Sequence, residues 1–412
     1  MSLPPELLLD IFRLAAATDC SRYEDASLEY KPFEPIAVRN RDWRPLRSSS
    51  KLAKFALTLV CKEWTQIAME VVYECILVGH NTEQLIQALA ANDNENGNRV
   101  RHIELSHEVD YDPFNPLPVL RVLQCCRLVE NITRPCLSES GGSILSTIRL
   151  PPGIQFPVFH NLRRIDWWLP GVGPNRGFLD QLVAYAPNLN YLTLSGGSDP
   201  SFLQSIQYNL FRAHKSYPNM TTLRFELERE DVITYPPDLS LPNLTHLIVG
   251  IVNNSAADGL MFLQNHGPLI KTLSFINVDM PNYMGFLVNT QDPEIPHKIF
   301  ALCPNITELH TTLRMGTLFN TKDAKDDEHA TLRALQNILF KNLKCIRIGL
   351  DDTSVVPSAN LSLFIIHNRI SHFPALERIV LHGDTEKWKG LMCYMMLRKY
   401  TMANKSILLQ FA

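Results

Sequence analysis

The chain lacks the long apolar runs and the charge imbalance that mark membrane-spanning and nucleic-acid-binding proteins. No stretch of its 412 residues reaches the roughly 18 to 20 apolar residues that a membrane-spanning helix requires. The formal net charge is −3, so we expect neither nucleic acid nor a membrane surface as a partner. One short segment, residues 39–47, is basic, and we interpret it as a solvated loop in preference to a targeting signal.

Cysteine pairs with metal-binding or disulfide-framework spacing are also lacking. The nine cysteines are an odd number, are widely spread and form no CxxC. This usage is typical of reduced thiols, so we expect a cytoplasmic or nuclear location, or both. The adjacent Cys125 and Cys126 are interpreted as core residues in preference to a nucleophile. Glu6 and Asp10 interrupt the first apolar stretch, which has no basic segment before it, so a secretory signal is not expected.

Catalytic motifs are the third absence. The sequence contains no GxGxxG, Walker-type loop, GxSxG or HExxH pattern. Its 13 histidines are scattered, and the acidic run at residues 323–328 is interpreted as a solvated loop. We therefore expect no catalytic residue, no metal site and no cofactor, and a protein that is not an enzyme. A hydrolase or transferase would require a polar pocket that the sequence does not indicate.

The sequence does contain an apolar helix close to its first residue. Pro5 suits the first helical turn, and Glu6 is favourable at the positive end of the helix dipole. The apolar residues that follow at helical spacing are Leu7, Leu8, Ile11, Phe12 and Ala15, with Leu9 and Leu14 extending beyond one stripe. A helix that is apolar on most sides needs partners on more than one face. One partner is its own domain; the other is either a second protein or more of this chain.

A polar interval separates this helix from a second helical segment. Residues 18–50 contain many charges and little periodicity, which predicts a loop or a partly disordered insert. Helical spacing then resumes at Leu52 and continues to Val71.

Together the two helical segments resemble the F-box. That family's pattern is a Leu-Pro-x-Glu-Leu start, an Ile-Phe pair, a Val-Cys-Lys-x-Trp core and a closing aromatic residue. The matching residues are Leu3, Pro4, Glu6, Leu7, Ile11, Phe12, Val60, Cys61, Lys62 and Trp64, with Tyr73 near the closing aromatic. The resemblance covers residues 2–78 and departs from the family at the 18–50 insert. This layout is similar to F-box-like proteins of filamentous and mushroom-forming fungi.

The resemblance implies a three-helix module that binds the Skp-type adaptor of a cullin–RING ubiquitin ligase and, through it, a cullin. Burial of a large apolar side chain in such a contact contributes about 1.5–3 kcal/mol before the costs of association. The residues that the resemblance assigns to adaptor binding are Leu3, Pro4, Leu7, Ile11, Phe12, Val60, Cys61 and Trp64. Alternatively, these residues form only the core of a helical cap on the domain that follows.

A recurring phrase dominates the rest of the chain. "PNLNYLTL" at residue 187, "PNLTHLIV" at 242 and "PALERIVL" at 374 share the frame L-x-x-L-x-L. The frame recurs at intervals of about 24 to 37 residues, which resembles a leucine-rich-repeat solenoid. Further copies begin at residues 160, 218, 269, 304 and 341, with looser ones at 99 and 143.

The segments between these phrases predict helices. Apolar residues fall at helical steps over residues 178–185, 202–210 and 332–339. Each strand and helix form a unit that buries its apolar face only by stacking on the next unit. We therefore predict an α/β fold: a helical F-box-like module at residues 1–78, then an irregular solenoid at residues 79–412. In this solenoid a parallel sheet forms the concave side and helices the convex side, without the asparagine ladder of regular repeats.

Two further helices are predicted at the ends of the solenoid. Residues 81–91 show helical spacing before a polar break at residues 92–98. Near the other end, we predict a helix over Glu386–Tyr400, with Trp388, Leu391, Met392 and Met395 on its apolar side, and then a closing strand, "SILLQFA".

The residues between the leucines of each strand are predicted to face the concave surface. Arginine and aromatic side chains there are typical anchors of protein interfaces. The candidate target-binding residues are Arg164, Trp168, Tyr191, Arg224, His246, His310, Arg347 and Arg378. The same face also carries Asp166, Thr193, Glu226, Glu308 and His382. Alternatively, all of these are ordinary surface residues of an exposed sheet.

Two functions are compatible with this organisation. The first is a substrate-recognition subunit of a Skp–cullin–F-box ubiquitin ligase, in which the repeats bind an unknown protein target. The second is a repeat-protein scaffold whose F-box-like segment is only a structural cap. Exposure of Leu7, Ile11, Phe12 and Trp64 would separate the two.

Overall fold

A computed structural model places a series of short strands and helices along the chain. The described residues are 3–16, 38–39, 52–78, 82–105, 117–134, 136–137, 156–168, 176–195, 207–208, 211, 216–226, 232–233, 238–250, 262–276, 300–312, 340–349, 373–403 and 406–412. They form two compact units, the first Met1–Tyr30, Pro35–Met220 and Thr234–Ser240, the second Lys31–Glu34, Thr221–Ile233 and Leu241–Ala412. The predicted boundary after residue 78 stays a prediction.

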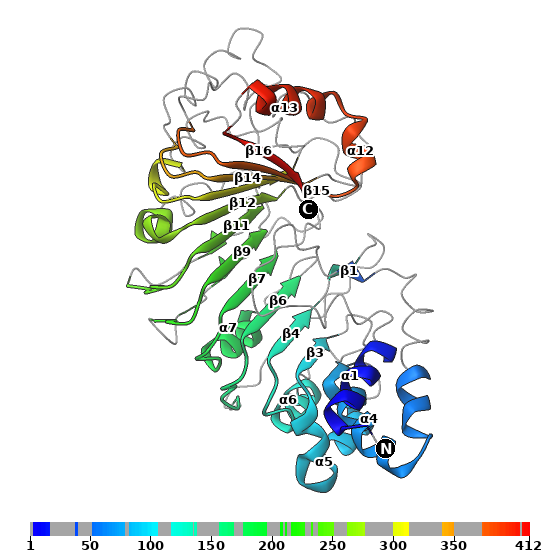
Figure 1. The fold of residues 1–412 in the computed structure, drawn as a ribbon. Helices are drawn as coiled ribbons and strands as arrows, with labels where there is room; N and C mark the ends of the chain where they lie inside the picture. The colour runs from blue at the N-terminus through cyan, green and yellow to red at the C-terminus, as the bar shows by residue number, and fades with distance from the viewer. Residues whose placement is uncertain are drawn as a thin grey trace. The chain divides into compact units, whose positions relative to one another are not determined.

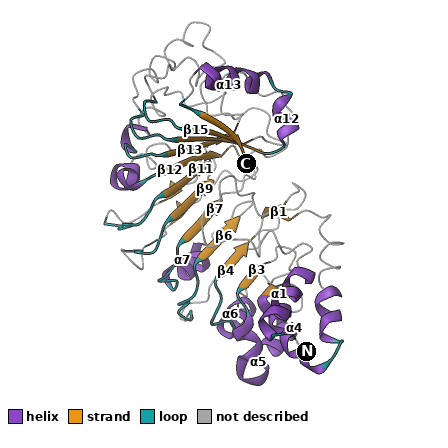
Figure 2. Ribbon diagram, viewed as in Figure 1, coloured by secondary structure: helices purple, strands orange, loops and turns teal. Residues whose placement is uncertain are grey.

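The fold is α/β, and its main feature is a parallel sheet of 12 strands, each following the previous one in the chain (Figures 1 and 2). The first unit contributes β2 (Cys75–Val78), β3 (His102–Leu105), β4 (Asn131–Arg134), β6 (Arg164–Trp168) and β7 (Tyr191–Ser195). The second contributes β9 (Thr222–Glu226), β11 (His246–Gly250), β12 (Thr272–Ile276), β13 (Glu308–Thr312), β14 (Cys345–Gly349), β15 (Arg378–His382) and β16 (Leu408–Phe411). This arrangement is compatible with the predicted solenoid, and the closing strand is confirmed.

A shared turn leads into each strand of the main sheet from β3 to β15 and explains the recurring sequence phrase. In the first unit the Leu189 N–H donates to the Ala186 carbonyl over 3.2 Å, and in the second the Ile306 N–H donates to Cys303 over 3.4 Å. The N–H groups of Thr307 and Glu308 then both donate to the Lys271 carbonyl of the preceding repeat, at 2.8 and 3.1 Å. The turn thereby sets the register of each strand against its neighbour.

The asparagine of the turn adds a side-chain bond between neighbouring repeats. Asn188 Nδ2 donates to the His160 carbonyl over 2.8 Å. The equivalent bonds in the second unit join Asn305 to Pro268 over 2.7 Å and Asn342 to Pro304 over 3.1 Å. A series of asparagines therefore precedes these strands, although the position after the strands lacks the asparagine of regular repeats. Its signal was the asparagine of the repeated phrase.

The leucines of the frame pack against helices on one side of the sheet. In the first unit, α7 (Arg176–Ala184) buries Phe178 and Leu182, and Phe178 stacks on Trp167 of β6 with ring centroids 6.1 Å apart. The predicted helix at residues 178–185 is thus confirmed. Further helices are α5 (Thr82–Arg99), α6 (Leu117–Cys125), the 3-10 helix η1 (Gly267–Leu269), and residues 262–266 and 300–302.

The predicted helix at residues 81–91 is confirmed, and so is the break after it. Within α5 the backbone leaves the helical conformation at Ala91, and Asn92, Asp93 and Asn94 have positive φ angles of 50°, 56° and 65°. Asparagine and aspartate tolerate this conformation better than other residues that carry a Cβ atom. The helix then resumes and reaches Arg99, so the break is shorter than predicted.

Two helix predictions require correction. At residues 202–210 the described part is strand β8 (Gln207–Tyr208), and Phe211 has a positive φ of 66°, so no helix runs through this segment. The predicted helix at Glu386–Tyr400 divides into α12 (Thr385–Lys389) and α13 (Met392–Ala403) around Gly390. Met395 is consequently exposed to solvent and, contrary to the prediction, does not lie on the apolar side of the helix. The predicted helix at residues 332–339 and the strand near residue 143 lie outside the described residues.

Short strands also occur away from the main sheet. β1 (Val38–Arg39), inside the 18–50 insert, pairs in parallel with β5 (Cys136–Leu137). A further short strand is β10 (Val232–Ile233). The insert, predicted as a loop, therefore contains at least one paired segment, and its other residues lie outside the described part.

Candidate functional site

Three helices of the first unit form a small module with its own apolar core. They are α1 (Pro5–Ala16), residues 52–58 and α4 (Lys62–Glu74). Phe12, Ala16, Ala68 and Val71 are buried in this core, and the Phe12 and Trp64 rings lie 4.8 Å apart. Leu8, Leu9, Leu57, Trp64 and Ile67 pack around it, partly buried.

Polar contacts hold these three helices in a defined arrangement. The Arg13 guanidinium donates to both carboxylate oxygens of Glu74, over 3.1 and 2.8 Å, and so joins α1 to the end of α4. Thr65 Oγ1 donates to the Thr58 carbonyl over 2.6 Å, which bridges the turn between the second and third helices. Cys61 Sγ accepts from the Trp64 N–H and caps the start of α4. The three helices are therefore held together by an ion pair, a hydrogen bond across the turn and a helix cap, in addition to the apolar core.

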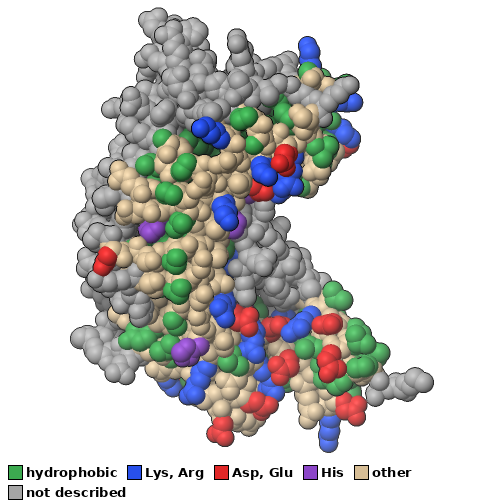
Figure 3. All heavy atoms as spheres, turned by 60° about the vertical axis from the view of Figure 1, so that its left-hand side comes forward, with side chains coloured by type: hydrophobic (Ala, Val, Ile, Leu, Met, Phe, Trp, Pro, Cys, Tyr) green, Lys and Arg blue, Asp and Glu red, His purple; other side chains and the backbone are tan. Residues whose placement is uncertain are grey.

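Two apolar stripes remain exposed on this module. The first follows α1 at helical spacing, and the second follows residues 52–60. Their members are Leu3, Leu7, Ile11 and Leu14, then Leu52, Phe55, Leu59 and Val60, with exposed fractions from 46% at Ile11 to 83% at Leu59. Hydrophobic side chains gather over these N-terminal helices in the space-filling view (Figure 3). We call this set the apolar surface of the module.

The predicted adaptor-binding residues divide between this surface and the core. Leu3, Pro4, Leu7, Ile11, Val60 and Cys61 are exposed. Phe12 is fully buried and Trp64 half-buried, because their rings pack together inside the module. Four further residues of this surface, Leu14, Leu52, Phe55 and Leu59, were not predicted as adaptor-binding residues from the sequence. Their signal was the apolar residue at every third or fourth position, from Leu7 to Leu14 in α1 and from Leu52 to Leu59 in the second segment.

A second candidate region is the polar face of the sheet. In the first unit, the side chains that β6 and β7 place on this face are buried. Arg164 of β6 donates to Asp166 over 2.6 Å, and its guanidinium lies 4.0 Å from the centre of the Tyr191 ring. Thr193 of β7 donates to Asp166 over 2.7 Å. All four side chains are buried. Arg164 and Tyr191, predicted to bind a target, therefore serve here as interior residues.

The other predicted target-binding residues of the sheet differ in exposure. Arg224 of β9 is buried, and His246 of β11 is half-buried, with its Nδ1 atom 2.9 Å from Thr245 Oγ1. Burial lowers the pKa of His246. Trp168 ends β6, but its side chain lies outside the described part.

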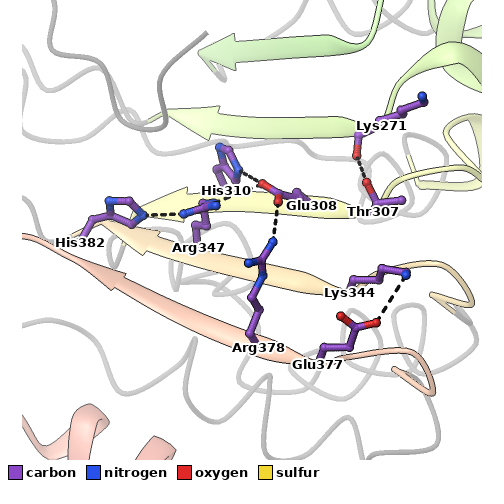
Figure 4. A network of polar contacts seen from close by, with 9 residues as sticks. All are labelled: Lys271, Thr307, Glu308, His310, Lys344, Arg347, Glu377, Arg378 and His382. Carbon is purple, nitrogen blue, oxygen red and sulfur yellow. Dashed lines mark hydrogen bonds and ion pairs between the residues drawn. The ribbon is translucent and has the colours of Figure 1, made fainter. Parts of the chain in front are cut away.

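The remaining three predicted residues meet in one network on β13, β14 and β15 (Figure 4). Glu308 is its centre. His310 Nε2 donates to Glu308 Oε2 over 3.2 Å, Arg347 Nε reaches the same oxygen over 3.2 Å, and Arg378 Nη2 reaches Oε1 over 3.3 Å. Arg347 Nη1 also donates to His382 Nε2 over 3.3 Å. We call these five residues the Glu308 cluster.

The protonation states of the Glu308 cluster follow from these contacts. The hydrogen bond from His310, together with Arg347, lowers the pKa of Glu308 to about 2. Burial, with Arg347 nearby, lowers the pKa of His382 to about 4, and burial lowers that of His310. At neutral pH the cluster therefore contains two guanidinium cations, one carboxylate and two neutral imidazoles. Since arginine can only donate, His382 Nε2 is the acceptor and its proton is on Nδ1.

Membrane-spanning helices and metal-binding clusters are absent from the described residues. None of their helices combines the length and apolarity needed to cross a membrane. Across the same residues, no group of three or more histidine, cysteine, aspartate and glutamate side chains is arranged to hold a metal ion. The two candidate regions are the apolar surface of the module and the Glu308 cluster. Comparison of the chain with protein-family models and with curated proteins finds no match.

Proposed function

We propose that this protein is the target-recognition subunit of a cullin–RING ubiquitin ligase and that its N-terminal module docks a Skp-type adaptor. The observation that carries the proposal is the apolar surface of the module. Eight large apolar side chains of one small module are between 46% and 83% exposed. Monomeric proteins seldom leave so many large apolar side chains of one small module in water, and a partner that covers them gains the free energy of their burial.

The rigidity of the module supports a docking role. A surface that is already ordered loses little conformational entropy when a partner binds. The Phe12–Trp64 contact and the Arg13–Glu74 ion pair hold the first stripe in place, and the hydrogen bond from Thr65 to the Thr58 carbonyl holds the second. Phe12 and Trp64 are thus positioning residues in this proposal, and Leu7, Ile11, Leu14 and Leu59 are contact residues.

The proposed mechanism is proximity rather than catalysis. The module holds the adaptor, and through it a cullin, while the sheet holds a protein target. Tethering of both in one assembly raises the effective concentration of a target lysine near the activated ubiquitin. No side chain of this chain is assigned a chemical step.

The experiment is co-purification of the full chain with a fungal Skp-type adaptor. The test variant is Leu7→Asp with Ile11→Asp, which places two carboxylates in the contact but leaves the Phe12 core intact. The matched control is Val158→Asp, because Val158 is 48% exposed and Ile11 is 46% exposed. We expect the wild type and the control to retain the adaptor and the double variant to lose it. Circular dichroism checks that all three are equally folded.

A scaffold with a structural cap is the second candidate, and one observation favours it. The last residue of α4, Glu74, is followed directly by β2, the strand at one end of the sheet order. If folded wild-type protein carries no adaptor, the module is a cap and the ligase proposal fails.

A further inference from the structure

We propose that the Glu308 cluster is a binding site for the carboxylate of an acidic residue in a protein ligand. The inference deepens the proposed function, since it rests on the sheet being the target-binding region, but it does not require the adaptor. Exposure, charge and unused donors of the cluster support it, each from a separate observation.

The two arginines of the cluster differ in exposure, with Arg347 20% exposed, and both keep N–H donors that the contacts within the cluster do not use. Arg378 is 45% exposed and contacts Glu308 through one nitrogen, Nη2, and the thiol of Cys345. Arg347 contacts Glu308 through Nε and His382 through Nη1. A guanidinium presents a fork of N–H donors that matches a carboxylate in two parallel hydrogen bonds. Each arginine therefore keeps donors for an incoming acid.

Glu308 also prepares both guanidiniums for binding. Its two oxygens hold Arg347 and Arg378 from neighbouring strands, at 3.2 and 3.3 Å, so the cations already converge before a ligand arrives (Figure 4). His310 fixes the carboxylate from below the surface, because His310 itself is buried. This preorganisation lowers the entropy that binding would otherwise cost.

The charge of the cluster indicates which acid fits. Two arginines and one carboxylate leave a single positive charge, because both histidines are neutral. One carboxylate neutralises that charge. A phosphate monoester, which carries about −1.5 to −2 at neutral pH, leaves excess negative charge beside Glu308. The neighbouring strand β16 contributes apolar surface, because its exposed Leu408 lies opposite Arg378 in the register. The favoured ligand is thus an acidic side chain in a protein segment with apolar neighbours.

The test uses three synthetic seven-residue peptide pools. Each pool has uncharged mixed residues around one fixed central residue: glutamate, glutamine or phosphoserine. The full chain, labelled with carbon-13 in its histidine rings, is titrated with each pool, and the signal of His382 reports on Arg347 beside it. The variant is Arg378→Gln, and the matched control is Arg121→Gln, an exposed arginine that pairs with Glu83 over 2.8 Å in the first unit.

We expect the glutamate pool to shift the His382 signal and the glutamine pool to leave it unchanged. Arg378→Gln should weaken the glutamate response at least roughly tenfold, and Arg121→Gln should match the wild type. The proposal is overturned if the glutamate and glutamine pools shift the His382 signal equally, or if neither pool shifts it. This comparison uses wild-type protein, so it does not depend on whether a variant folds. A stronger, Arg378-dependent response to phosphoserine assigns the site to a phosphoryl group instead. If wild-type protein does not bind the adaptor but still responds to the glutamate pool, the ligase proposal fails and the carboxylate-site proposal stands.

Discussion

The polar face of the sheet differs between strands β6 and β7 of the first unit and strands β13 to β15 of the second. In the first unit, Arg164 and Asp166 form a buried ion pair under the Tyr191 ring. In the second unit, Arg378 contacts Glu308 while its own side chain stays half-exposed to solvent. Arg164 and Arg378 occupy the same place in the strand frame, yet only one is available to a partner. The difference teaches that frame position decides which face a side chain takes, and that neighbouring side chains decide whether it is accessible.

The register gives the physical reason for this difference. Arg164 lies opposite Tyr191, a large ring that covers the guanidinium. Arg378 lies opposite the small Cys345 on one side and Leu408 of the exposed strand β16 on the other. The first arginine is therefore enclosed by its neighbours, whereas the second stays half-exposed, as the proposed binding site requires.

The largest expected effect tests the buried side of the comparison. Asp166→Ala removes the carboxylate that pairs with the buried Arg164 and that accepts from Thr193. We expect a loss of about 3–5 kcal/mol in the free energy of unfolding, measured by chemical denaturation of the first unit's transition. A loss below about 1 kcal/mol would show that Arg164 reaches water and that the two faces do not differ.

The second effect compares close packing in the units. A Cβ atom added at Gly97 would lie 2.2 Å from the Cys125 carbonyl oxygen, whereas one at Gly390 would lie 3.5 Å from its nearest neighbour. We expect Gly97→Ala to lower the unfolding free energy by about 1–3 kcal/mol because α5 and α6 must move apart. Gly390→Ala should be nearly neutral. Thermal unfolding of both variants checks the contrast, and equal melting temperatures would contradict it.

The third effect is the pH dependence of the second unit. The pKa of Glu308 is lowered to about 2, so its contribution is complete above its ordinary pKa of 4.5 and is lost as pH falls from 4.5 to 2. The pKa of His382 is lowered to about 4, so stability is also lost as pH falls from 6.5 to 4. We expect each to contribute on the order of 1–2 kcal/mol. Unfolding measured from pH 7 to 4 should depend less on pH in His382→Gln, with His160→Gln as the control.

The smallest expected effect tests the open side of the comparison. Arg378→Gln removes a half-exposed ion pair, so the unfolding free energy should change by less than about 1 kcal/mol. Denaturation of this variant beside Asp166→Ala measures the contrast directly. A loss comparable to that of Asp166→Ala would mean that Arg378 is a structural residue.

Much of the fold was predictable, and less of the two surfaces was. The strands followed from local spacing, because Leu192 and Leu194 alternate with Tyr191 and Thr193 and alternation places them on opposite faces. The break in α5 followed from the run of asparagines. The helix predicted at residues 202–210 was wrong at its described end, since three widely spaced apolar residues do not exclude a strand at Tyr208.

On the N-terminal module, periodicity could not identify the outer face. α1 is apolar on both sides, and only packing against α4 decides that Phe12 is interior and that Leu14 is exposed. The prediction that Phe12 and Trp64 belong with the contact residues followed from their place in the motif. Their contact with each other was not visible in the sequence.

The sequence by itself determined the parallel sheet, the turn that precedes each strand and the helical character of residues 5–16, because each depends on spacing along a few residues. The tertiary structure decided which of these residues water can reach. It buried Arg164 under Tyr191, left Arg378 half-exposed beside Cys345, and brought Glu308, Arg347 and His382 together from three strands. Accessibility and charge balance depend on residues far apart in the chain, and local pattern carries no record of them.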